Sequence, residues 1–369
     1  MALNQEMTKD KLDIEPFRQW NPAGDNLLLI AGPCSAESER QVMNTAAQLI
    51  EHKINIFRAG IWKPRSKPYT FTGCGEKGIP WLLEVKREFH LPVMVEVMNA
   101  DQLNLVLDKG IDYIWLGART TINPYMMDEI SEALHGCDIP VFIKNPISPD
   151  LNTWIGALER INDAGIHKIA TIHRGFQSVY SAPLRNEPHW DLPVKLKCMF
   201  PDLPILCDPS HIAGETKYIE DIVKKALALE TSGLMVEVHN NPSEALSDDK
   251  QQLTPTQFGK MLKNVNFHDR CCSLVSNTPE QEEIIAKINT CRQIIDGCNE
   301  DLIKVLAQRM AAVKEIGKAK RQIELPALQA SRWREVMNQC LSLADELGLS
   351  RELVTEIMDV IHKYSIKIQ

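Results

Sequence analysis

Eight short apolar runs, separated by longer amphipathic stretches, constrain the fold of this chain more than any other feature. Each run is nearly continuous in apolar residues, which is typical of strands buried on both faces of a parallel sheet. A helical pattern lies between most neighbouring runs, as in 101–109 and 150–164. The runs are Leu27–Ala31, Asn55–Ala59, Pro92–Val97, Tyr113–Gly117, Pro140–Asn145, Lys168–His173, Pro204–Asp208 and Leu234–His239.

Two α/β architectures are built from such repeats. An open doubly wound sheet would usually carry a glycine-rich phosphate turn after its first strand, and the segment after Ile30 holds no such turn. Eight units of strand plus helix in about 240 residues fit a (β/α)₈ barrel. The pattern therefore favours a TIM barrel over residues 1–263.

The pattern changes after the barrel. Residues 264–280 are polar and irregular, which indicates a linker. One helical periodicity without proline then runs from Glu282 to about Ile323, and such a helix of ~40 residues spans ~60 Å. Two shorter helical patterns follow, at 328–347 and 350–368. Because the first helix is too long to bury against its own small domain, residues 281–369 are predicted to form an all-α three-helix domain that dimerises with a second copy.

Charge and composition limit the partners of this protein. The net charge is −8, and residues 281–369 hold equal numbers of acidic and basic side chains, so the negative charge lies in the rest. An acidic domain disfavours nucleic acid as a partner. No apolar run reaches the ~20 residues that cross a bilayer, and the polar N-terminus does not resemble a signal peptide. Ten cysteines without an export signal indicate reduced thiols and a cytoplasmic location.

Polar side chains gather where the predicted strands end. Cys34 follows the first strand, and the residue type alone leaves three roles open: a nucleophile, a metal ligand or a buried apolar residue. A thiol with imidazole and carboxylate groups at one barrel mouth forms a plausible divalent-metal set, and six cations there suit a multiply anionic substrate. The candidate ligands at these strand ends are Cys34, His173, Asp208, His211, Glu237, His239 and Asp248, and the cations are Arg58, Lys63, Arg65, Arg119, Lys144 and Arg174.

Five short motifs carry a family resemblance. They are Ala31-Gly32-Pro33-Cys34-Ser35, Lys63-Pro64-Arg65-Ser66, Gly117-Ala118-Arg119-Thr120, Asp208-Pro209-Ser210-His211 and Glu237-Val238-His239. Together they resemble the type I 3-deoxy-D-arabino-heptulosonate 7-phosphate (DAHP) synthases, most closely the β subgroup, over about residues 20–263. The sister 3-deoxy-octulosonate 8-phosphate synthases share the first motif but normally carry Lys-Ala-Asn-Arg where this chain has Lys63-Pro64-Arg65. Ser66 replaces the usual threonine and keeps its hydroxyl.

The resemblance implies a metal-dependent condensation of phosphoenolpyruvate with erythrose 4-phosphate. It implies that Cys34, His211, Glu237 and Asp248 bind the cation. Our hypothesis for that cation is Mn²⁺, with Zn²⁺, Fe²⁺ and Co²⁺ as alternatives. The resemblance further implies that Arg65 and Ser66 meet the aldose phosphate, and Lys63 is our candidate for the proton donor. The residues implied for phosphoenolpyruvate are Arg58, Lys63, Arg119, Lys144 and Arg174.

The long C-terminal helix carries a second set of cations. Arg309 and Lys320 lie eleven residues apart and share one face, whereas Arg292 lies about 26 Å from Arg309 along the helix. If all three bind one small ligand, Arg292 must come from a partner chain. Solvent-facing cations on a long helix are the alternative.

Spacing in this region is similar to the all-helical (AroQ-class) chorismate mutases. The matching segments are 292–296, 306–309 and 316–320, and the spacing continues to Gln369. The resemblance implies an intertwined dimer that rearranges chorismate to prephenate. It implies that Arg292, Arg309, Arg332 and Ser365 bind substrate and that Lys320 and Gln369 bind the ether oxygen.

Two positions depart from that family's pattern. Trp333 stands where a glutamate is usual, and Gln329 replaces an acidic residue. We expect mutase activity to survive, and a catalytically silent sensor and dimerisation module is the alternative. The fusion itself also predicts that prephenate, bound at the helical domain, inhibits the barrel.

Overall fold

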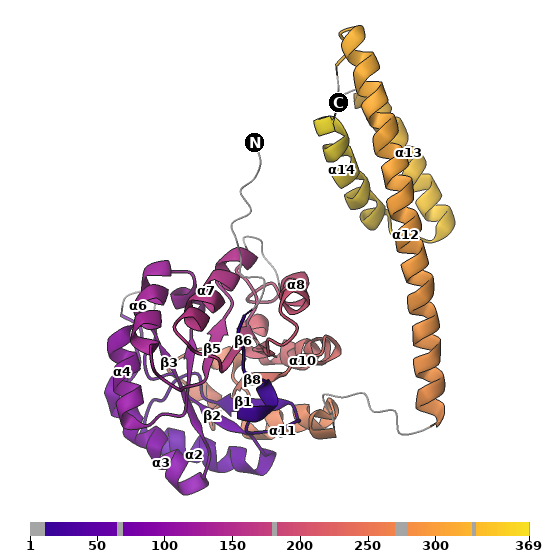
Figure 1. Ribbon diagram of the computed structural model, residues 1–369. Coiled ribbons are helices and arrows are strands. Elements are labelled where there is room, and N and C mark those ends of the chain that lie inside the picture. Colours follow the sequence, from indigo (N-terminus) through magenta and orange to yellow (C-terminus); the bar gives the residue numbers. More distant parts are fainter. Residues whose placement is uncertain (1–11, 65–68, 179–182, 270–278, 327–329, 369) are drawn as a thin grey trace. The chain divides into compact units, whose positions relative to one another are not determined.

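A computed structural model describes residues 12–64, 69–178, 183–269, 279–326 and 330–368. The chain divides into two compact units, Met1–Leu274 and Val275–Gln369 (Figure 1). The relative placement of the two units is not determined, so each is described by itself.

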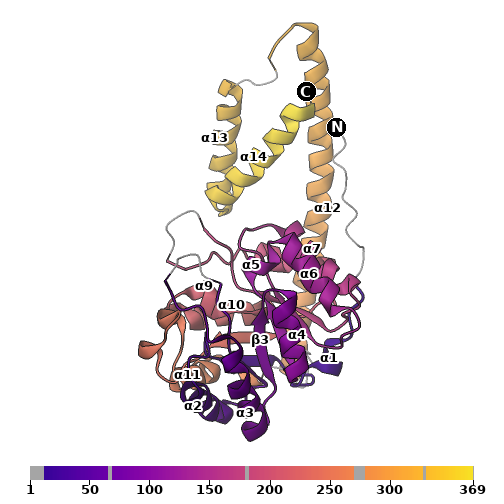
Figure 2. The same cartoon turned by 90° about the vertical axis from the view of Figure 1, so that its left-hand side faces the viewer.

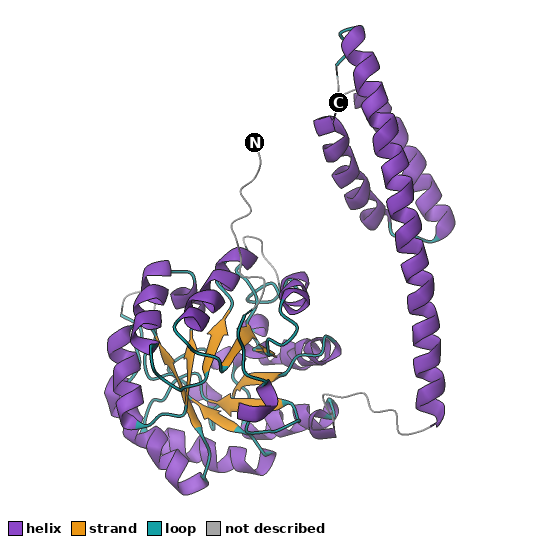
Figure 3. Cartoon of the chain, in the orientation of Figure 1, coloured by secondary structure: helices purple, strands orange, loops and turns teal. Residues whose placement is uncertain are grey.

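The first unit is a closed barrel of eight parallel strands in sequence order (Figure 3). The pairing of β1 with β8, from Leu28 with Gly233 to Gly32 with Glu237, closes the ring and excludes the open sheet. The predicted (β/α)₈ architecture is thus confirmed. The strands are β1 (Leu28–Gly32), β2 (Ile56–Arg58), β3 (Val93–Val97), β4 (Tyr113–Leu116), β5 (Val141–Lys144), β6 (Ile169–His173), β7 (Ile205–Cys207) and β8 (Gly233–Glu237).

Helices surround the strands (Figures 2 and 3). Several begin at a side chain that caps the first backbone N–H groups, such as Ser38 before α2 and Asn99 before α4, and each such cap stabilises a helix by about 1 kcal/mol. The helices of this unit are α1 (Phe17–Trp20), α2 (Glu39–Leu49), α3 (Ile79–Phe89), α4 (Ala100–Lys109), α5 (Ala118–Thr121), α6 (Pro124–Leu134), α7 (Leu151–Asp163), α8 (Asp191–Met199), α9 (Pro209–Ala213), α10 (Ile219–Ala228) and α11 (Pro255–Asn264).

Two apolar cores hold the barrel together. The larger lies between strands and helices, and the smaller fills the barrel interior with side chains such as Ile30, Trp115 and Phe142. Trp20, from the segment before β1, packs edge-on against Phe142 at a centroid distance of 5.8 Å. In barrels with a filled interior, ligands bind at the carboxyl ends of the strands.

The end of the barrel unit differs from the sequence expectation. Residues from 264 onward were expected to form a polar linker, but Val265 and Phe267 are each 3% exposed and belong to the larger core. A short 3₁₀ turn, Phe267–Asp269, follows α11. Single apolar side chains in a polar stretch carry no periodicity, so the sequence pattern could not place them in the core.

The second unit contains the three helices predicted for it: α12 (Pro279–Gln322), α13 (Ala330–Leu347) and α14 (Arg351–Ile368). Helix α14 packs against both α12 and α13 (Figures 1 and 2). At 1.5 Å per residue α12 is about 66 Å long and the other two about 27 Å each. Among the described residues of this unit, α13 and α14 are therefore each too short to cover more than half of α12. Across the described residues of both units, no helix combines the length and apolarity needed to span a membrane.

Candidate functional site

A cavity of about 370 Å³ opens at the carboxyl ends of the barrel strands. Most of its lining side chains are charged. They come from the carboxyl ends of the strands and from the segments that follow these ends. The lining residues are Arg58, Lys63, Pro64, Glu96, Gly117, Ala118, Arg119, Lys144, Ile147, Arg174, Gln177, Arg185, Asn186, His211 and Asp248. The structure thus brings together five of the six cations that the sequence places at this mouth, and Arg65 and Ser66 lie outside the described residues.

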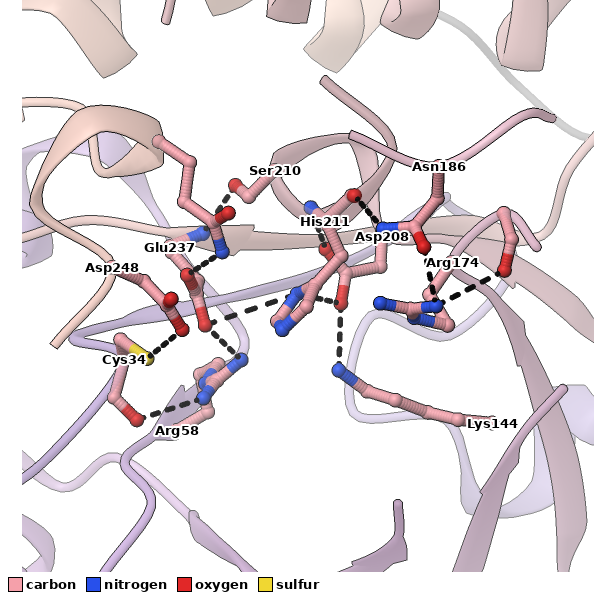
Figure 4. Close-up of polar contacts among 12 residues, drawn as sticks. Cys34, Arg58, Lys144, Arg174, Asn186, Asp208, Ser210, His211, Glu237 and Asp248 are labelled. Carbon is pink, nitrogen blue, oxygen red and sulfur yellow. Dashed lines mark hydrogen bonds and ion pairs between the residues drawn. The ribbon is translucent and has the colours of Figure 1, made fainter. Parts of the chain in front are cut away.

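A thiol and two carboxylates meet at one side of this mouth (Figure 4). One ligand atom each from Cys34, Glu237 and Asp248 lies within 4.8 Å of the others. Cys34 Sγ donates to Asp248 Oδ2 at 3.1 Å, and Lys63 Nζ donates to Cys34 Sγ at 2.9 Å. Burial, aided by Glu237, raises the pKa of the Cys34 thiol to about 12. A free thiol held protonated in this way is a weak nucleophile, because the thiolate is the reactive form.

His211 lies beside this cluster, although its ring nitrogens are not within 4.8 Å of all three ligand atoms. Its Nδ1 is 2.8 Å from Asp208 Oδ2 and 3.9 Å from Glu237 Oε1. Burial lowers the pKa of His211, although Asp208 and Glu237 oppose that shift. A neutral imidazole is the form that binds metals.

Asp208 organises the centre of the site. It caps α9 by accepting from the backbone N–H of His211 at 3.0 Å, and its Oδ2 accepts from Lys144 Nζ at 2.6 Å. Burial alone would raise the pKa of Asp208, but His211 and Lys144 hold it well below its usual range. One buried carboxylate therefore fixes both an imidazole and a cation of the cavity.

The residues at this mouth fit a divalent cation. Glu237 is fully buried, and its Oε1 has no hydrogen-bond donor among the described residues, although Arg58 Nη1 lies 3.3 Å away. A buried carboxylate oxygen without a donor is costly unless something else satisfies it. Thiolate, imidazole and carboxylate together form a common ligand set for Zn²⁺, Fe²⁺ and similar ions.

Two cations of the cavity are held in place by aromatic and amide groups. The Arg58 guanidinium lies 4.6 Å from the centroid of Trp115, which contributes a favourable cation–π interaction. Arg174 Nη1 donates to Asn186 Oδ1 at 2.9 Å, and burial lowers the pKa of Arg174 to about 10. Positioned guanidinium groups in a partly buried cavity are suited to phosphate and carboxylate.

Sequence reasoning missed several residues of this site. Arg185 and Asn186 come from the same loop as Arg174, and their position after a barrel strand was the available signal. Glu96 sits so close to Gly117 that a Cβ there would lie 2.0 Å from its Oε1, which explains the glycine. The ion pair between Asp208 and Lys144 joins residues 64 positions apart, and no sequence pattern predicts such a contact.

In the helical unit the structure joins two of the predicted site residues. Arg309 Nη1 on α12 donates to Ser365 Oγ on α14 at 2.7 Å, and Ser365 is buried. Lys320 is half-buried, whereas Arg292 is exposed. Arg332 is exposed as well and pairs with Glu335 on its own helix. The ends of the predicted set, Gln369 and the departing residue Gln329, lie outside the described residues.

Trp333 has an aromatic partner in the same unit. Its ring stacks on that of His362 with centroids 3.8 Å apart and an interplanar angle of 14°. The stack joins α13 to α14, one turn from Ser365. An indole has no carboxylate with which to bind a substrate hydroxyl, and here it contacts an imidazole instead.

Comparison with known proteins decides the family of the barrel. Residues 13–269 match the DAHP synthetase I family. The chain belongs to that family. A phospho-2-dehydro-3-deoxyheptonate aldolase of Thermotoga maritima is 32% identical over 237 residues, covering 64% of this chain and 68% of that protein. A 2-dehydro-3-deoxyphosphooctonate aldolase of Desulfotalea psychrophila is 26% identical and covers 65% of this chain and 89% of that protein.

Solved structures agree with this DAHP synthase assignment. The crystal structure of the Thermotoga maritima DAHP synthase superimposes with a TM-score of 0.60 at 31% identity, covering 66% of this chain and 69% of that one. A truncated form of 3-deoxy-D-arabino-heptulosonate 7-phosphate synthase from the same organism gives a TM-score of 0.57 at 29% identity, covering 66% and 86%.

Residues 291–369 match chorismate mutase type II. The chain therefore contains a DAHP synthase domain followed by a chorismate mutase domain. Both resemblances drawn from the motifs are confirmed at the family level, and the two domains support a role in the biosynthesis of aromatic compounds.

Proposed function

We propose that the barrel condenses phosphoenolpyruvate with erythrose 4-phosphate and water to give DAHP and phosphate. The observation that carries this proposal is the pairing, in one cavity, of five cations with a thiol–carboxylate cluster. The cations suit the two anionic groups of phosphoenolpyruvate. The DAHP synthetase I match and the higher identity to the heptonate aldolase than to the octonate aldolase favour the four-carbon aldose over the five-carbon one.

In this proposal, some cavity residues bind the substrates and one residue transfers a proton. We assign Arg58, Arg119, Lys144 and Arg174 to the phosphate and carboxylate of phosphoenolpyruvate, and Arg65 with Ser66 to the aldose phosphate. C3 of the enol phosphate attacks the aldehyde carbon, water adds to the cationic C2 that results, and phosphate leaves. Lys63 gives a proton to the alkoxide formed from the aldehyde. Burial would lower the pKa of Lys63, but Cys34 and Glu237 raise it above its ordinary value, so the ammonium form is available.

A divalent cation completes this proposal. Cys34, His211, Glu237 and Asp248 would hold it, and Mn²⁺ is the ion we favour, with Zn²⁺, Fe²⁺ and Co²⁺ as alternatives. When bound, such an ion polarises the aldehyde oxygen as a Lewis acid. The buried Glu237 Oε1, which lacks a hydrogen-bond donor among the described residues, and the neutral His211 support the assignment.

Chelation tests the metal dependence of the full-length protein. After exhaustive chelation and removal of the chelator, DAHP formation is expected to stop, and added Mn²⁺ is expected to restore it. The rearrangement of chorismate, which needs no metal in this account, should continue in the same sample and serves as the internal control. Full DAHP formation after exhaustive chelation would contradict the proposed metal centre.

We also propose that the helical unit rearranges chorismate to prephenate in a site shared between two copies of the chain. Arg309 and Ser365 are already paired, and Lys320, Arg332 and Gln369 would complete the part contributed by one copy. Arg292 lies seventeen residues before Arg309 on a straight helix, about 26 Å away, so it would come from the partner. Catalysis would consist of holding the compact conformer and stabilising charge on the ether oxygen.

The surface of α12 supports the dimer. Ile288, Ile295 and Leu302 recur every seven residues on one face and are 45%, 56% and 60% exposed in the single chain. A continuous apolar stripe of this length is stabilised when a second helix covers it. The alternative, a catalytically silent dimerisation and sensor module, predicts the same stripe but no chorismate turnover.

Inhibition of DAHP formation by prephenate is the regulatory part of the proposal. It is supported only by the presence of both domains in one chain, which places the enzyme of an early step beside a domain that binds a later metabolite. A DAHP synthase rate that does not change at saturating prephenate would rule it out. A cytoplasmic location goes with this proposal, because the substrates are phosphorylated intermediates of central metabolism.

A further inference from the structure

A short turn after β8 contacts several candidate metal ligands at once. It comprises residues 247–252 and includes the 3₁₀ turn Asp249–Gln251. Asp248 belongs to it and adopts a left-handed backbone conformation, with φ of 50°. Gln251 and Gln252 are both 1% exposed. Two consecutive buried glutamines beside a predicted metal centre call for a physical explanation, because buried amides need partners for all their polar atoms.

Each glutamine binds a different candidate ligand. Gln251 Nε2 donates to Glu237 Oε2 at 2.6 Å. Gln252 Oε1 accepts from the backbone N–H of Cys34 at 2.9 Å, and its Nε2 donates to the carbonyl of Ser247 at 2.8 Å. The second glutamine therefore fixes the backbone of Cys34, and the first acts directly on a carboxylate.

The orientation of the Gln251 amide is unambiguous. Its Oε1 accepts from Arg185 Nη1, a group that can only donate, and its Nε2 faces a carboxylate, which accepts. The same Arg185 Nη1 lies 3.0 Å from Asp248 Oδ1. A chain of contacts thus runs from Glu237 through Gln251 and Arg185 to Asp248, joining two candidate ligands 11 residues apart by groups that are not ligands themselves.

We infer that Gln251 is a positioning residue for the metal centre: its amide holds Glu237 by Oε2 and leaves Oε1 3.9 Å from Nδ1 of His211, another candidate ligand. The inference rests on the metal centre proposed above. Oε1 is the carboxylate oxygen without a hydrogen-bond donor among the described residues, as expected for an atom reserved for a cation. Groups that orient metal ligands commonly contribute about 10- to 100-fold to metal affinity.

The test replaces Gln251 in the full-length protein and measures metal affinity directly. Gln251→Met keeps the length of the side chain and removes both hydrogen bonds. Gln257→Met is the matched control, since Gln257 is an exposed glutamine six residues away that caps α11 and contacts no candidate ligand. Co²⁺ is titrated into metal-free protein, the thiolate-to-metal absorption reports binding at Cys34, and a competing chelator gives the dissociation constant.

Gln251→Met is expected to weaken Co²⁺ binding by about 10- to 100-fold relative to Gln257→Met and to alter the thiolate-to-metal band. Arg185→Met provides a second variant at the other partner of the Gln251 amide, and the Arg185 side chain is 41% exposed. This substitution removes the hydrogen bond from Arg185 to Gln251 Oε1, and it is expected to weaken Co²⁺ binding several-fold. Chorismate turnover by the helical unit should remain, and tryptophan fluorescence, to which the barrel unit contributes six of the seven tryptophans, shows that the barrel is folded.

Two results would overturn the inference, and they are distinguishable. If wild type binds Co²⁺ at Cys34 and both variants bind it as tightly as Gln257→Met, Gln251 does not position a ligand although the metal centre stands. If wild type and Cys34→Ala bind Co²⁺ equally, with no thiolate-to-metal band, the metal centre itself is wrong and the inference falls with it.

Discussion

At the scale of single residues, the barrel mouth is organised by buried carboxylates that each bind more than one partner. Asp208 holds Lys144 and His211, and Glu237 lies beside Arg58 and His211. Because a buried charge is costly unless it is paired, each carboxylate fixes its cation, Lys144 or Arg58, and the His211 imidazole in position before any substrate enters. The cavity is therefore preorganised for anions although the barrel carries the protein's entire negative charge.

Lys63 offers the most direct residue-level prediction. Replacing it as Lys63→Met removes the proposed proton donor, and general acid catalysis of this kind contributes about 10²- to 10⁴-fold to a rate. The rate of DAHP formation is expected to fall by that factor, while chorismate turnover stays unchanged. Lys217→Met, at an exposed lysine of the same unit, is the control. A Lys63→Met protein that keeps half of the wild-type rate would show that another group supplies the proton.

His173 predicts how stability responds to acid. It is 1% exposed, and burial lowers its pKa from 6.5 to about 3. Between these values the unfolded chain binds a proton that the folded chain does not, so this residue makes folding less favourable as the pH falls below about 6.5. From pH 6.5 to pH 5 the contribution is about 2 kcal/mol.

The measurement for His173 compares urea unfolding of wild type and His173→Phe at pH 6.5 and pH 5, followed by tryptophan fluorescence. Six of the seven tryptophans belong to the barrel unit, so the signal reports its unfolding. The variant is expected to lose about 2 kcal/mol less than wild type over this interval. Equal losses in the two proteins would mean that His173 is charged in the folded barrel.

At the scale of secondary-structure elements, α12 is the helix whose apolar stripe is left exposed by the other described helices of its unit. Helices α13 and α14 are each less than half as long as α12, and the heptad-spaced apolar residues of α12 remain exposed. A second copy of the helix would cover this stripe and carry Arg292 toward the Arg309–Ser365 pair of its partner. In the proposed dimer, α12 would therefore link assembly to mutase chemistry.

Subunit complementation tests this link. Arg292→Ala and Arg309→Ala are each expected to abolish chorismate turnover alone. Mixed and allowed to exchange subunits, they form heterodimers in which one of the two shared sites is intact, so random pairing restores about a quarter of wild-type turnover. Two inactive variants that stay inactive after verified exchange would place Arg292 outside the site or both residues in the same chain's site.

At the scale of the whole molecule, periodicity was sufficient to predict both units. Eight continuous apolar runs predicted the barrel, because a strand buried on both faces is apolar at nearly every position. One uninterrupted 3.6-residue pattern predicted α12, because an amphipathic helix is apolar along one stripe only. Motif spacing then predicted which loops carry the candidate site, since strand ends of a barrel meet at one mouth.

The remaining features depend on contacts that no repeat encodes. The bridge from Glu237 through Gln251 and Arg185 to Asp248 joins two separate loops, and the burial of Phe267 adds a single apolar residue to a core. Such contacts are set by side-chain directions after the backbone has folded. They could be found only in the structure.

The central claim is that one chain carries two separate active sites, one in each unit. It is tested most directly by assaying both reactions in purified full-length Arg58→Ala and Arg309→Ala proteins. Arg58→Ala is expected to lose DAHP formation and keep chorismate turnover, and Arg309→Ala is expected to show the reverse. A wild-type protein that lacks either activity, or an Arg309→Ala protein that still rearranges chorismate at the wild-type rate, would contradict the account.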